Sequence, residues 1–534
     1  MDCRWDEISI MNARLSQLLN FNIGLSRVKA DIADAREFVR HPNELDLVRI
    51  DEAAWLKDLQ QKVAVGYVPS AAVIADVPKG SGGIRPAALL TLEDRVVYAS
   101  ALAYALPQIH SALAWSQGTV DFAYRLVRSA GHDWFGNQFT GWSDFRRKSV
   151  DLIAEGIPFV VITDVTGFYE NIALQRLASD LNQMGIDGEI ISLLSKCLNL
   201  WAQVEGRGIP QGNSASDVLA KVYLNPTDHQ MIESGFTVSR YVDDIRIFCT
   251  SDAEAKRALI VLTQSLRRRG LNLQAAKTKM LVASDAIREI DGVIPHIEAA
   301  RDSFIREVRE MAGEVNPYLT LEQSEQLIEI RKPGVPIENL RNQFQAYFME
   351  RSIDFDKSLF HFLLNRLGNH GDNFAADYCL SILSEHPEET GVILSYLEKI
   401  GVTTEHLLRL EQFLRSEEAV YEYQVYQILE FAMDQNAEKA PGLLSLIRQI
   451  AFDRGRPDYL RAVARVVIGK LGTVGDLELI EASFATAAPG LDRAQVLCAL
   501  GRMERGRRNG FLARTQGSDQ HCARAANFVR QTLG

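Results

Sequence analysis

The pattern of apolar and polar positions divides this 534-residue sequence into three parts. Residues 1–65 carry apolar residues at three- and four-residue spacing, which predicts an N-terminal helical segment. Residues 66–295 mix short apolar runs, typical of strands, with longer helical stretches, and this mixture predicts an α+β domain. Residues 296–534 consist of one amphipathic pattern after another, separated by Gly or Pro, which predicts an all-α domain of stacked helices.

The most informative strand pattern lies in the segment SRYVDDIRIF. Residues that favour strands flank the Tyr241-Val242-Asp243-Asp244 stretch on both sides, so the segment predicts a hairpin with the acidic pair at its turn. Adjacent carboxylates repel each other, and a divalent cation such as Mg²⁺, which prefers oxygen ligands, relieves that repulsion. An exposed Asp-Asp turn without a metal is the alternative interpretation, and the neighbouring segments must decide between the two.

A second acidic position follows another predicted strand. Residues 159–162 form a continuous apolar run, which predicts a covered strand, and Asp164 stands where that strand ends. A carboxylate at a buried strand end is unfavourable unless a cation or hydrogen bonds compensate it. We therefore expect this strand to lie beside the hairpin, so that Asp164, Asp243 and Asp244 form one cluster. Two divalent ions held by such a cluster would activate a 3′ hydroxyl and stabilise a leaving pyrophosphate.

The loop between the two acidic segments is rich in glycine. In GRGIPQGNSAS, glycines surround Gln211, and Ser214 or Ser216 is predicted to cap the helix that follows. A loop that leads into a helix amino terminus offers free N–H groups to a phosphate or a base. An ordinary connecting loop is the alternative for this stretch taken alone.

Basic residues occur where they could contact phosphate groups. Lys79 and Arg85 flank the Gly-rich tip of VPKGSGGIRP, where paired cations would grip a nucleotide, although an exposed basic turn fits the segment equally well. Lys277, in LNLQAAKTKM, is placed to donate a proton to a leaving pyrophosphate. Residues 115–150 interleave aromatic and basic residues as single-stranded nucleic acid requires, but helix packing explains each aromatic residue better.

Composition narrows the class of protein. A hydrophobic content of 47% with 24% charged residues is typical of soluble globular proteins, and no apolar run is long enough for a membrane span. The amino terminus has acids where a signal peptide needs basic and apolar residues, so we expect a cytoplasmic protein with no membrane contact. The six cysteines form no CxxC pair, which predicts reduced packing thiols and no zinc site. Because the net charge is −11, any nucleic acid must bind through a local basic groove.

The order and spacing of these segments resemble those of reverse transcriptases. Asp164 with Tyr169 is similar to motif A of that family, GIPQGNSAS to motif B, YVDD to motif C and LNLQAAKTK to motif D. VPKGSGGIRP and LEDRVVYASAL resemble the motifs of the fingers. The resemblance covers about residues 65–295 and implies the fingers and palm of a right-hand polymerase.

The resemblance implies a role for each residue in RNA-directed DNA synthesis from dNTPs on an RNA template. Asp164, Asp243 and Asp244, together with Val165, would hold two Mg²⁺ ions, with Mn²⁺ as the alternative. Tyr169 would screen the sugar 2′ position against ribonucleotides. The remaining nucleotide-binding residues would be Lys79 and Arg85 at the triphosphate and Gln211 and Gly212 near the templating pair.

The carboxyl-terminal helices resemble the HEAT-like α-helical repeat domain of abortive-infection and defence-associated bacterial reverse transcriptases. That resemblance implies antiphage defence, a homo-oligomer such as a trimer or hexamer, and DNA synthesis that can start from a protein hydroxyl, with or without a template. The candidate priming hydroxyls are Tyr318, Tyr421, Tyr423, Tyr426 and Tyr459. Two alternatives are a retron- or group II intron-like enzyme that uses a dedicated non-coding RNA, and a non-catalytic scaffold that binds nucleic acid.

Overall fold

The computed structural model describes residues 12–33, 37–80, 82–128, 131, 133–136, 139–291, 337–350, 355–435 and 440–532. The chain forms two compact units. The first unit combines Met1–Phe38, Asp51–Ala75 and Pro86–Gly292, and the second combines Val39–Ile50, Asp76–Arg85 and Val293–Gly534. These packing units interleave along the chain, so the domain boundaries expected near residues 65 and 295 stay a prediction.

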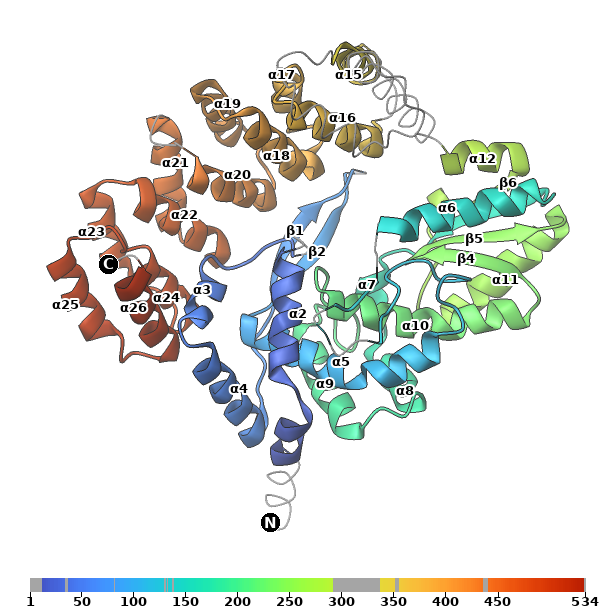
Figure 1. Ribbon diagram of the computed structural model, residues 1–534, viewed down its shortest axis with the longest axis horizontal. Helices are drawn as coiled ribbons and strands as arrows, with labels where there is room; N and C mark the ends of the chain where they lie inside the picture. Colours follow the sequence, from blue (N-terminus) through green and yellow to red (C-terminus); the bar gives the residue numbers. More distant parts are fainter. Residues whose placement is uncertain are drawn as a thin grey trace, which may run out of the picture. The chain divides into compact units, whose positions relative to one another are not determined.

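The first unit is built around an antiparallel sheet with the strand order β4-β5-β3-β6 (Figure 1). The strands are β3 (Phe159–Asp164), β4 (Thr237–Tyr241), β5 (Asp244–Cys249) and β6 (Lys279–Val282). Val160 and Val161 of β3 are completely buried, as expected of a continuous apolar run. The predicted hairpin and the predicted strand that ends at Asp164 are both confirmed.

Helices cover both faces of this sheet. On one face lie α6 (Phe139–Ala154) and α12 (Ala283–Asp291), where Ile153 packs with Val160 and Phe248 in one apolar cluster. On the other side lie α10 (Ser214–Glu233) and α11 (Asp252–Arg268) (Figure 1). The central strands β3 and β5 are therefore largely buried, whereas the edge strand β6 is mostly exposed.

The first unit also contains the long, largely buried helix α5 (Leu92–Leu113), which contacts α2, α9 and α10. The remaining helical elements of this unit are α2 (Phe21–Ala33), α4 (Glu52–Gly66), α7 (Phe168–Asn171), α8 (Leu174–Gln183), α9 (Gly188–Trp201) and the 3₁₀ turn η1 (Ala275–Lys277). Strands β1 (Val73–Pro78) and β2 (Ile84–Leu89) form a separate hairpin. The expected helical character of residues 1–65 is confirmed where the structure describes them.

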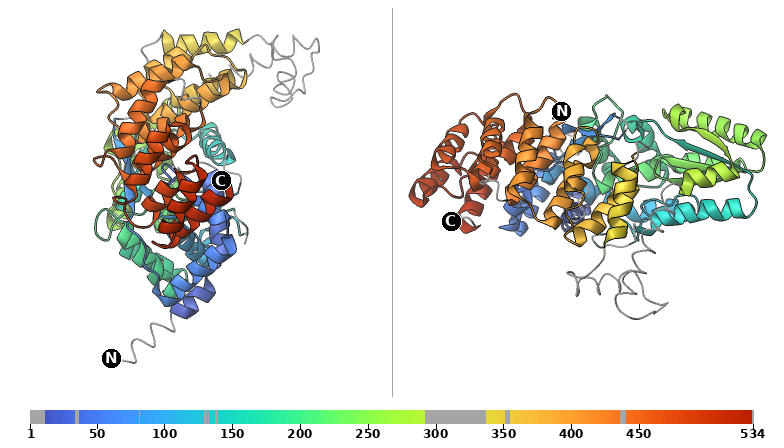
Figure 2. Two further views of the ribbon diagram at one scale, coloured as in Figure 1. Left: turned by 90° about the vertical axis from the view of Figure 1, so that its left-hand side faces the viewer. Right: turned by 90° about the horizontal axis from the view of Figure 1, so that it is seen from above.

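The second unit is helical in its described residues, apart from the tip of the β1–β2 hairpin. Its elements are α3 (Glu44–Arg49), α15 (Glu338–Phe344), η3 (Gln345–Met349), α16 (Lys357–Asn369), α17 (Ala376–Ser381), η4 (Pro387–Glu389), α18 (Thr390–Ile400), α19 (Thr404–Arg415), α20 (Glu422–Asp434), α21 (Pro441–Phe452), α22 (Asp458–Leu471), α23 (Val474–Ser483), α24 (Leu491–Cys498), α25 (Arg505–Thr515) and α26 (Gln520–Thr532). Each even-numbered helix from α16 to α24 packs against the next even-numbered helix, and α17, α19 and α21 follow one another in the same way. Figure 2 shows this succession from α16 to the carboxyl terminus.

Two expectations from composition can be compared with the described residues. Cys197, Cys249, Cys379, Cys498 and Cys522 are buried and form no disulfide, as expected of packing thiols. No helix in the described part of the chain has both the length and the apolar character needed to cross a bilayer.

Candidate active site

The YVDD stretch forms a tight turn between β4 and β5. Tyr241 pairs with Asp244, and Val242 and Asp243 make the two-residue loop. Val242 has a φ of 58°, a left-handed conformation that is rare for a β-branched residue. A positive φ at the first loop position alone is the pattern of a type II′ turn, whose twist matches that of the flanking strands. The turn therefore holds backbone strain at the place where it displays two carboxylates.

Strand β3 brings a third carboxylate to this turn. In the antiparallel register of β3 and β5, Asp164 lies directly opposite Asp244. Residues directly opposite each other share one face of a sheet, so both side chains project from the same face at the same end. Asp243 is the adjacent residue at the turn. The three carboxylates that were expected to cluster are thus neighbours, and their catalytic role stays a prediction.

The neighbouring carboxylates make one another harder to ionise. Burial raises the pKa of Asp243 to about 7, and the negative charges of Asp164 and Asp244 add to this effect. The pKa of Asp244 is raised as well, first by burial and then by the charge of Asp164. A bound cation would stabilise the ionised form of this cluster, because it would replace repulsion with attraction.

Lys277 places a positive charge beside the cluster. Its Nζ donates to Oδ2 of Asp164 at 2.6 Å. Partial burial lowers the pKa of Lys277, but its hydrogen bond to Asp164 and the nearby carboxylates outweigh this and raise it overall. The turn η1 is held against β3, since the N–H of Gln274 donates to the carbonyl oxygen of Asp164 at 2.7 Å. The lysine is therefore protonated at neutral pH and within reach of the carboxylates.

The chemistry of the donor set fits a hard divalent cation. Carboxylate oxygens are the ligands that Mg²⁺ prefers, and the raised pKa values of Asp243 and Asp244 show that their charges lack full compensation. In the residues that the structure describes, no group of three or more His, Cys, Asp or Glu side chains is placed, as it stands, so that it could hold a metal ion. Val165, the fourth predicted ligand, directly follows β3, is buried, and forms an isolated β-bridge with Leu273. Its ligand role stays a prediction.

The raised pKa of Asp243 predicts a pH dependence of stability. Between 3.8, its ordinary value, and about 7, the folded metal-free protein holds a proton that the unfolded chain has released. The free energy of unfolding should therefore fall as the pH rises through this window, and Asp243→Asn should flatten the slope. Thermal melts in EDTA at a series of pH values would measure it. Identical slopes for the wild type and the variant would contradict the prediction.

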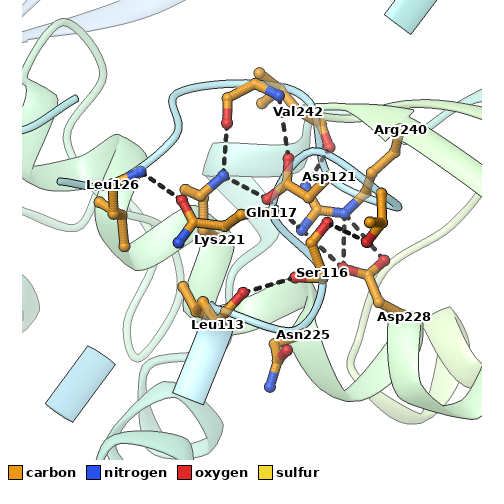
Figure 3. A network of polar contacts seen from close by, with 12 residues as sticks. Leu113, Ser116, Gln117, Asp121, Leu126, Lys221, Asn225, Asp228, Arg240 and Val242 are labelled. Atoms are coloured by element: carbon orange, nitrogen blue, oxygen red, sulfur yellow. Dashed lines mark hydrogen bonds and ion pairs between the residues drawn. The ribbon is translucent and has the colours of Figure 1, made fainter. Parts of the chain in front are cut away.

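A buried network of charged side chains lies next to the turn (Figure 3). Asp121 accepts hydrogen bonds from Lys221 and from Arg240, and Arg240 also donates to both oxygens of Asp228, at 3.0 and 2.9 Å. All four side chains are at most 5% exposed, and their two positive and two negative charges balance. Nη1 of Arg240 donates to the carbonyl oxygen of Val242 at 3.2 Å. The network therefore connects the strained turn to the core of the first unit.

Sequence patterns did not indicate this network. Its members come from the loop after α5, from α10 and from β4, so the ion pair between Asp121 and Arg240 joins positions 119 residues apart. The available signal was Arg240 itself, a charged residue inside a short strand that is otherwise largely buried. A buried charge requires a partner, but the sequence does not say which residue provides it.

Tyr169 lies on α7, close to the carboxylates. Gly167 has a φ of 53°, and the helix begins at Phe168 directly after it. The hydroxyl of Tyr169 donates to Oδ1 of Asp217 on α10 at 2.6 Å. Burial raises the pKa of Tyr169 well above its ordinary value, and the charges of Asp217 and Asp243 act in the same direction. The side chain is therefore a neutral, fixed aromatic group beside the cluster.

The glycine-rich loop is held between α7 and β2. Gly208 has a φ of 100°, and a Cβ atom there would lie 3.3 Å from the carbonyl oxygen of Glu170, so glycine permits this close approach. The N–H of Ala88 on β2 donates to the carbonyl oxygen of Gln211 at 3.3 Å, and Gly212 follows with a φ of 98°. The loop that was expected to meet the templating pair is thus fixed on both sides, while its contact with a base stays a prediction.

The predicted serine cap of α10 is wrong. The helix begins at Ser214 after Asn213, which makes no side-chain cap bond. Asp31 on α2 instead accepts hydrogen bonds from the N–H of Ser214 at 3.1 Å and from its Oγ at 2.6 Å. The hydroxyl of Ser216 is hydrogen-bonded to that of Tyr98 at 3.0 Å. The acceptor at the helix start comes from 183 positions away, so the local sequence could not show it.

Lys79 and Arg85 belong to the second unit, on the tip of the β1–β2 hairpin. The N–H of Lys79 donates to the carbonyl oxygen of Gly83 at 2.8 Å and closes the tip. The predicted contact of these two side chains with a triphosphate stays a prediction.

Most of the described aromatic residues between positions 115 and 150 serve packing. Those that are buried are Phe122, Trp134, Phe135 and Phe145. The side chain of Phe139 lies outside the described residues. Packing is therefore the main role of this aromatic group, as the alternative interpretation held, and Trp142 is an exception.

Comparison with known proteins agrees with the motif assignment. Residues 77–309 match the family model described as reverse transcriptase (RNA-dependent DNA polymerase). This segment contains the three clustered carboxylates as well as Tyr169, Gln211 and Lys277. The curated proteins offer no significant match to the chain.

Solved structures with a detectable likeness to the chain include yeast telomerases. Telomerase from Candida albicans, in complex with a fragment of telomeric RNA, is 10% identical over 72% of this chain and 68% of its own, with a TM-score of 0.32. Telomerase from Candida tropicalis, in complex with the corresponding RNA fragment, is 12% identical over 74% and 67% of the two chains, with a TM-score of 0.31. At this distance the likeness carries no argument about function.

Proposed function

We propose that this chain, which contains a reverse transcriptase domain and is an RNA-directed DNA polymerase, joins deoxynucleotides at the carboxylates of Asp164, Asp243 and Asp244. The observation that carries this proposal is the strand register that sets Asp164 opposite Asp244 at the strained turn. Primer extension on an RNA template by the purified protein tests it. A folded protein that incorporates no dNTP would contradict it.

The side chains at this site divide the chemistry among them. Asp164, Asp243 and Asp244, with the carbonyl oxygen of Val165, would hold two Mg²⁺ ions, or Mn²⁺ in their place. When bound, such ions lower the pKa of a primer 3′ hydroxyl and stabilise the charge on the leaving pyrophosphate. Lys277, whose raised pKa keeps it protonated, donates a proton to that pyrophosphate.

Two further pairs of residues would recognise the nucleotide and its template. Lys79 and Arg85 would bind the triphosphate of the incoming dNTP, because paired cations suit phosphate oxygens. Gln211 and Gly212, on the loop fixed between α7 and β2, would contact the templating pair. The substrates are thus a dNTP and an RNA template with a growing DNA strand.

Tyr169 would exclude ribonucleotides by occupying the space of a 2′ hydroxyl. Tyr169→Ala should raise kcat/KM for ribonucleotides relative to dNTPs by about 10- to 200-fold, since it opens that space. Tyr169→Phe loses the hydrogen bond to Asp217 but keeps the ring, and it should keep most of the discrimination. The ratio of kcat/KM values for a dNTP and its ribonucleotide measures the effect. If this ratio of kcat/KM values were unchanged in Tyr169→Ala, the proposed role of Tyr169 would be contradicted.

We infer that the polymerase serves antiphage defence, as an enzyme of the abortive-infection type with a HEAT-like repeat domain. The successive packing of α16, α18, α20, α22, α24 and α26 supports such a domain, because stacked helices in parallel rows are the usual solenoid architecture. The resemblance of the carboxyl-terminal helices to that repeat domain also supports a homo-oligomer, such as a trimer or hexamer. Plaque assays on cells that express the wild type or Asp243→Asn/Asp244→Asn test the defence role.

Each outcome of the plaque assay has a clear meaning. Protection by the wild type alone supports polymerase-dependent defence. Equal protection by both proteins favours a non-catalytic scaffold. No protection by either protein, at equal expression, contradicts the defence role. Co-purification of one defined RNA would instead favour a retron- or intron-like enzyme with a dedicated RNA.

Synthesis primed from a protein tyrosine can be tested separately. Tyr426 and Tyr459 are buried, and the hydroxyl of Tyr426 donates to the carbonyl oxygen of Arg40 at 3.3 Å, so neither hydroxyl is accessible without local opening. Tyr421 and Tyr423 are only partly buried and are better placed to act as primers. Tyr318 lies outside the described residues. Product formed without an added primer, and released as free DNA only after protease, would support self-priming.

A further inference from the structure

Trp142 is the exception among the aromatic residues near the acidic cluster because the residue is 44% exposed. It lies in the first turn of α6 and packs edge-on against Tyr241 of the YVDD turn, with ring centroids 5.1 Å apart and an interplanar angle of 88°. Its other aromatic neighbour is Phe145, at 5.7 Å. A large aromatic surface left in water forgoes the stabilisation of full burial, which suggests that it has a use.

The path of α6 places Trp142 on the face of the sheet that carries the carboxylates. The directly opposed residues on this face are Asp164 with Asp244, Ile162 with Arg246, and Val160 with Phe248. The carboxyl-terminal end of α6 covers the last pair through Ile153. Its middle covers Arg246, which donates to Oγ of Ser149 at 2.8 Å. The amino-terminal end of α6, where Trp142 lies, therefore borders the open end of this face, beside the carboxylates.

Close packing fixes this end of α6. A Cβ atom on Gly141 would lie 2.8 Å from the carbonyl oxygen of Phe122 and 3.4 Å from the ring of Tyr241. Glycine at this position therefore allows the first turn of α6 to lie directly against the YVDD turn. Phe145 follows Trp142 by about one helical turn on α6. The guanidinium of Arg246 lies 3.9 Å from the centre of the Phe145 ring, which adds a second fixed contact. The indole of Trp142 is thus held at a set place relative to the carboxylates.

We propose that Trp142 is a stacking platform for a base of the nucleic acid that ends at Asp164, Asp243 and Asp244. The inference rests on the proposed polymerase function, which requires the reacting end of a strand to lie on this face. Every base has an aromatic face, so stacking on an indole needs no particular sequence. The exposed neighbours Thr140 and Ser143 are polar, and one aromatic ring among polar residues fits a single base better than a protein surface.

Binding measurements without dNTP test the platform independently of catalysis. Fluorescence anisotropy would give the Kd of a labelled RNA–DNA primer–template for the wild type, Trp142→Ala and Trp142→Phe. Trp142→Ala should raise the Kd about tenfold, the range expected for the loss of one base stack, whereas Trp142→Phe should stay within about threefold. Ile260→Ala is the matched control, because Ile260 is 57% exposed on α11 at the opposite face and should leave the Kd unchanged.

A DNA strand that lacks one base distinguishes stacking on Trp142 from a general effect on packing. In a series of strands that each lack a base at a different position, binding to the wild type should weaken at one position. At that position the missing base should cause no further loss of binding to Trp142→Ala. Equal Kd values for the wild type and Trp142→Ala would overturn the platform while leaving the polymerase assignment intact. The platform would also be overturned if the melting temperature of Trp142→Ala were so low that partial unfolding explained its weaker binding. A wild type that binds no primer–template would reject both the platform and the proposed function.

Discussion

Arg240→Met is expected to lower the free energy of unfolding by about 3–5 kcal/mol, because it leaves the buried carboxylate of Asp228 without its cation. Asp121 keeps Lys221 as a partner, so Asp228 accounts for most of the cost. A loss of this size is a large part of the stability of an ordinary domain. Urea denaturation followed by circular dichroism measures it. A variant as stable as the wild type would show that the network is not held together by these charges.

Arg240→Lys separates the position of the turn from the stability of the fold. It keeps the positive charge but cannot retain the bond to the carbonyl oxygen of Val242 together with those to both acids. We expect kcat to fall about 10- to 100-fold while KM for dNTP changes little, since a shift of the turn moves the carboxylates. Arg269→Lys is the matched control, because Arg269 pairs with Asp180 and makes no described contact with the turn. Equal kcat values in these two variants would contradict a positioning role for Arg240.

Asp243→Asn/Asp244→Asn is expected to reduce dNTP incorporation at least 1000-fold, which corresponds to about 4 kcal/mol of transition-state stabilisation. The same variant should be no less stable than the wild type without metal at neutral pH or above. The reason is that burial and mutual repulsion raise the pKa values of these carboxyl groups, so their ionised forms destabilise the fold. Single-turnover incorporation and melting temperature together measure the two effects. If the variant lost activity because it unfolded, Asp243 and Asp244 would be needed for stability, and the prediction would be contradicted.

The acidic cluster could be predicted because each member sits in a local pattern. The hairpin at Asp243 and Asp244 is signalled by strand-favouring residues on both sides, and Asp164 by the buried run that it ends. That these two strands lie side by side was an expectation from chemistry, and the structure confirms it. Local sequence patterns therefore predicted these carboxylates, because the site lies at strand ends.

Other parts of the site depend on contacts between distant residues. Asp31 occupies the start of α10 in place of the predicted serine cap, and the acceptor lies on a helix far away in the sequence. The ion pairs of Arg240 with Asp121 and Asp228 depend on how the loop after α5 and α10 meet β4. Which aromatic residue stays exposed, Trp142 and not Phe145, is likewise decided by the way α6 packs on the sheet.

The most direct test of the central claim is single-nucleotide incorporation by the purified wild type and Asp243→Asn/Asp244→Asn proteins on RNA templates that differ only in the templating base. We predict that the wild type adds the complementary dNTP in a reaction that requires Mg²⁺ or Mn²⁺, and that the variant adds none. Addition by the wild type that ignores the templating base would contradict RNA-directed synthesis. Addition by the variant at the wild-type rate would contradict the assignment of these carboxylates.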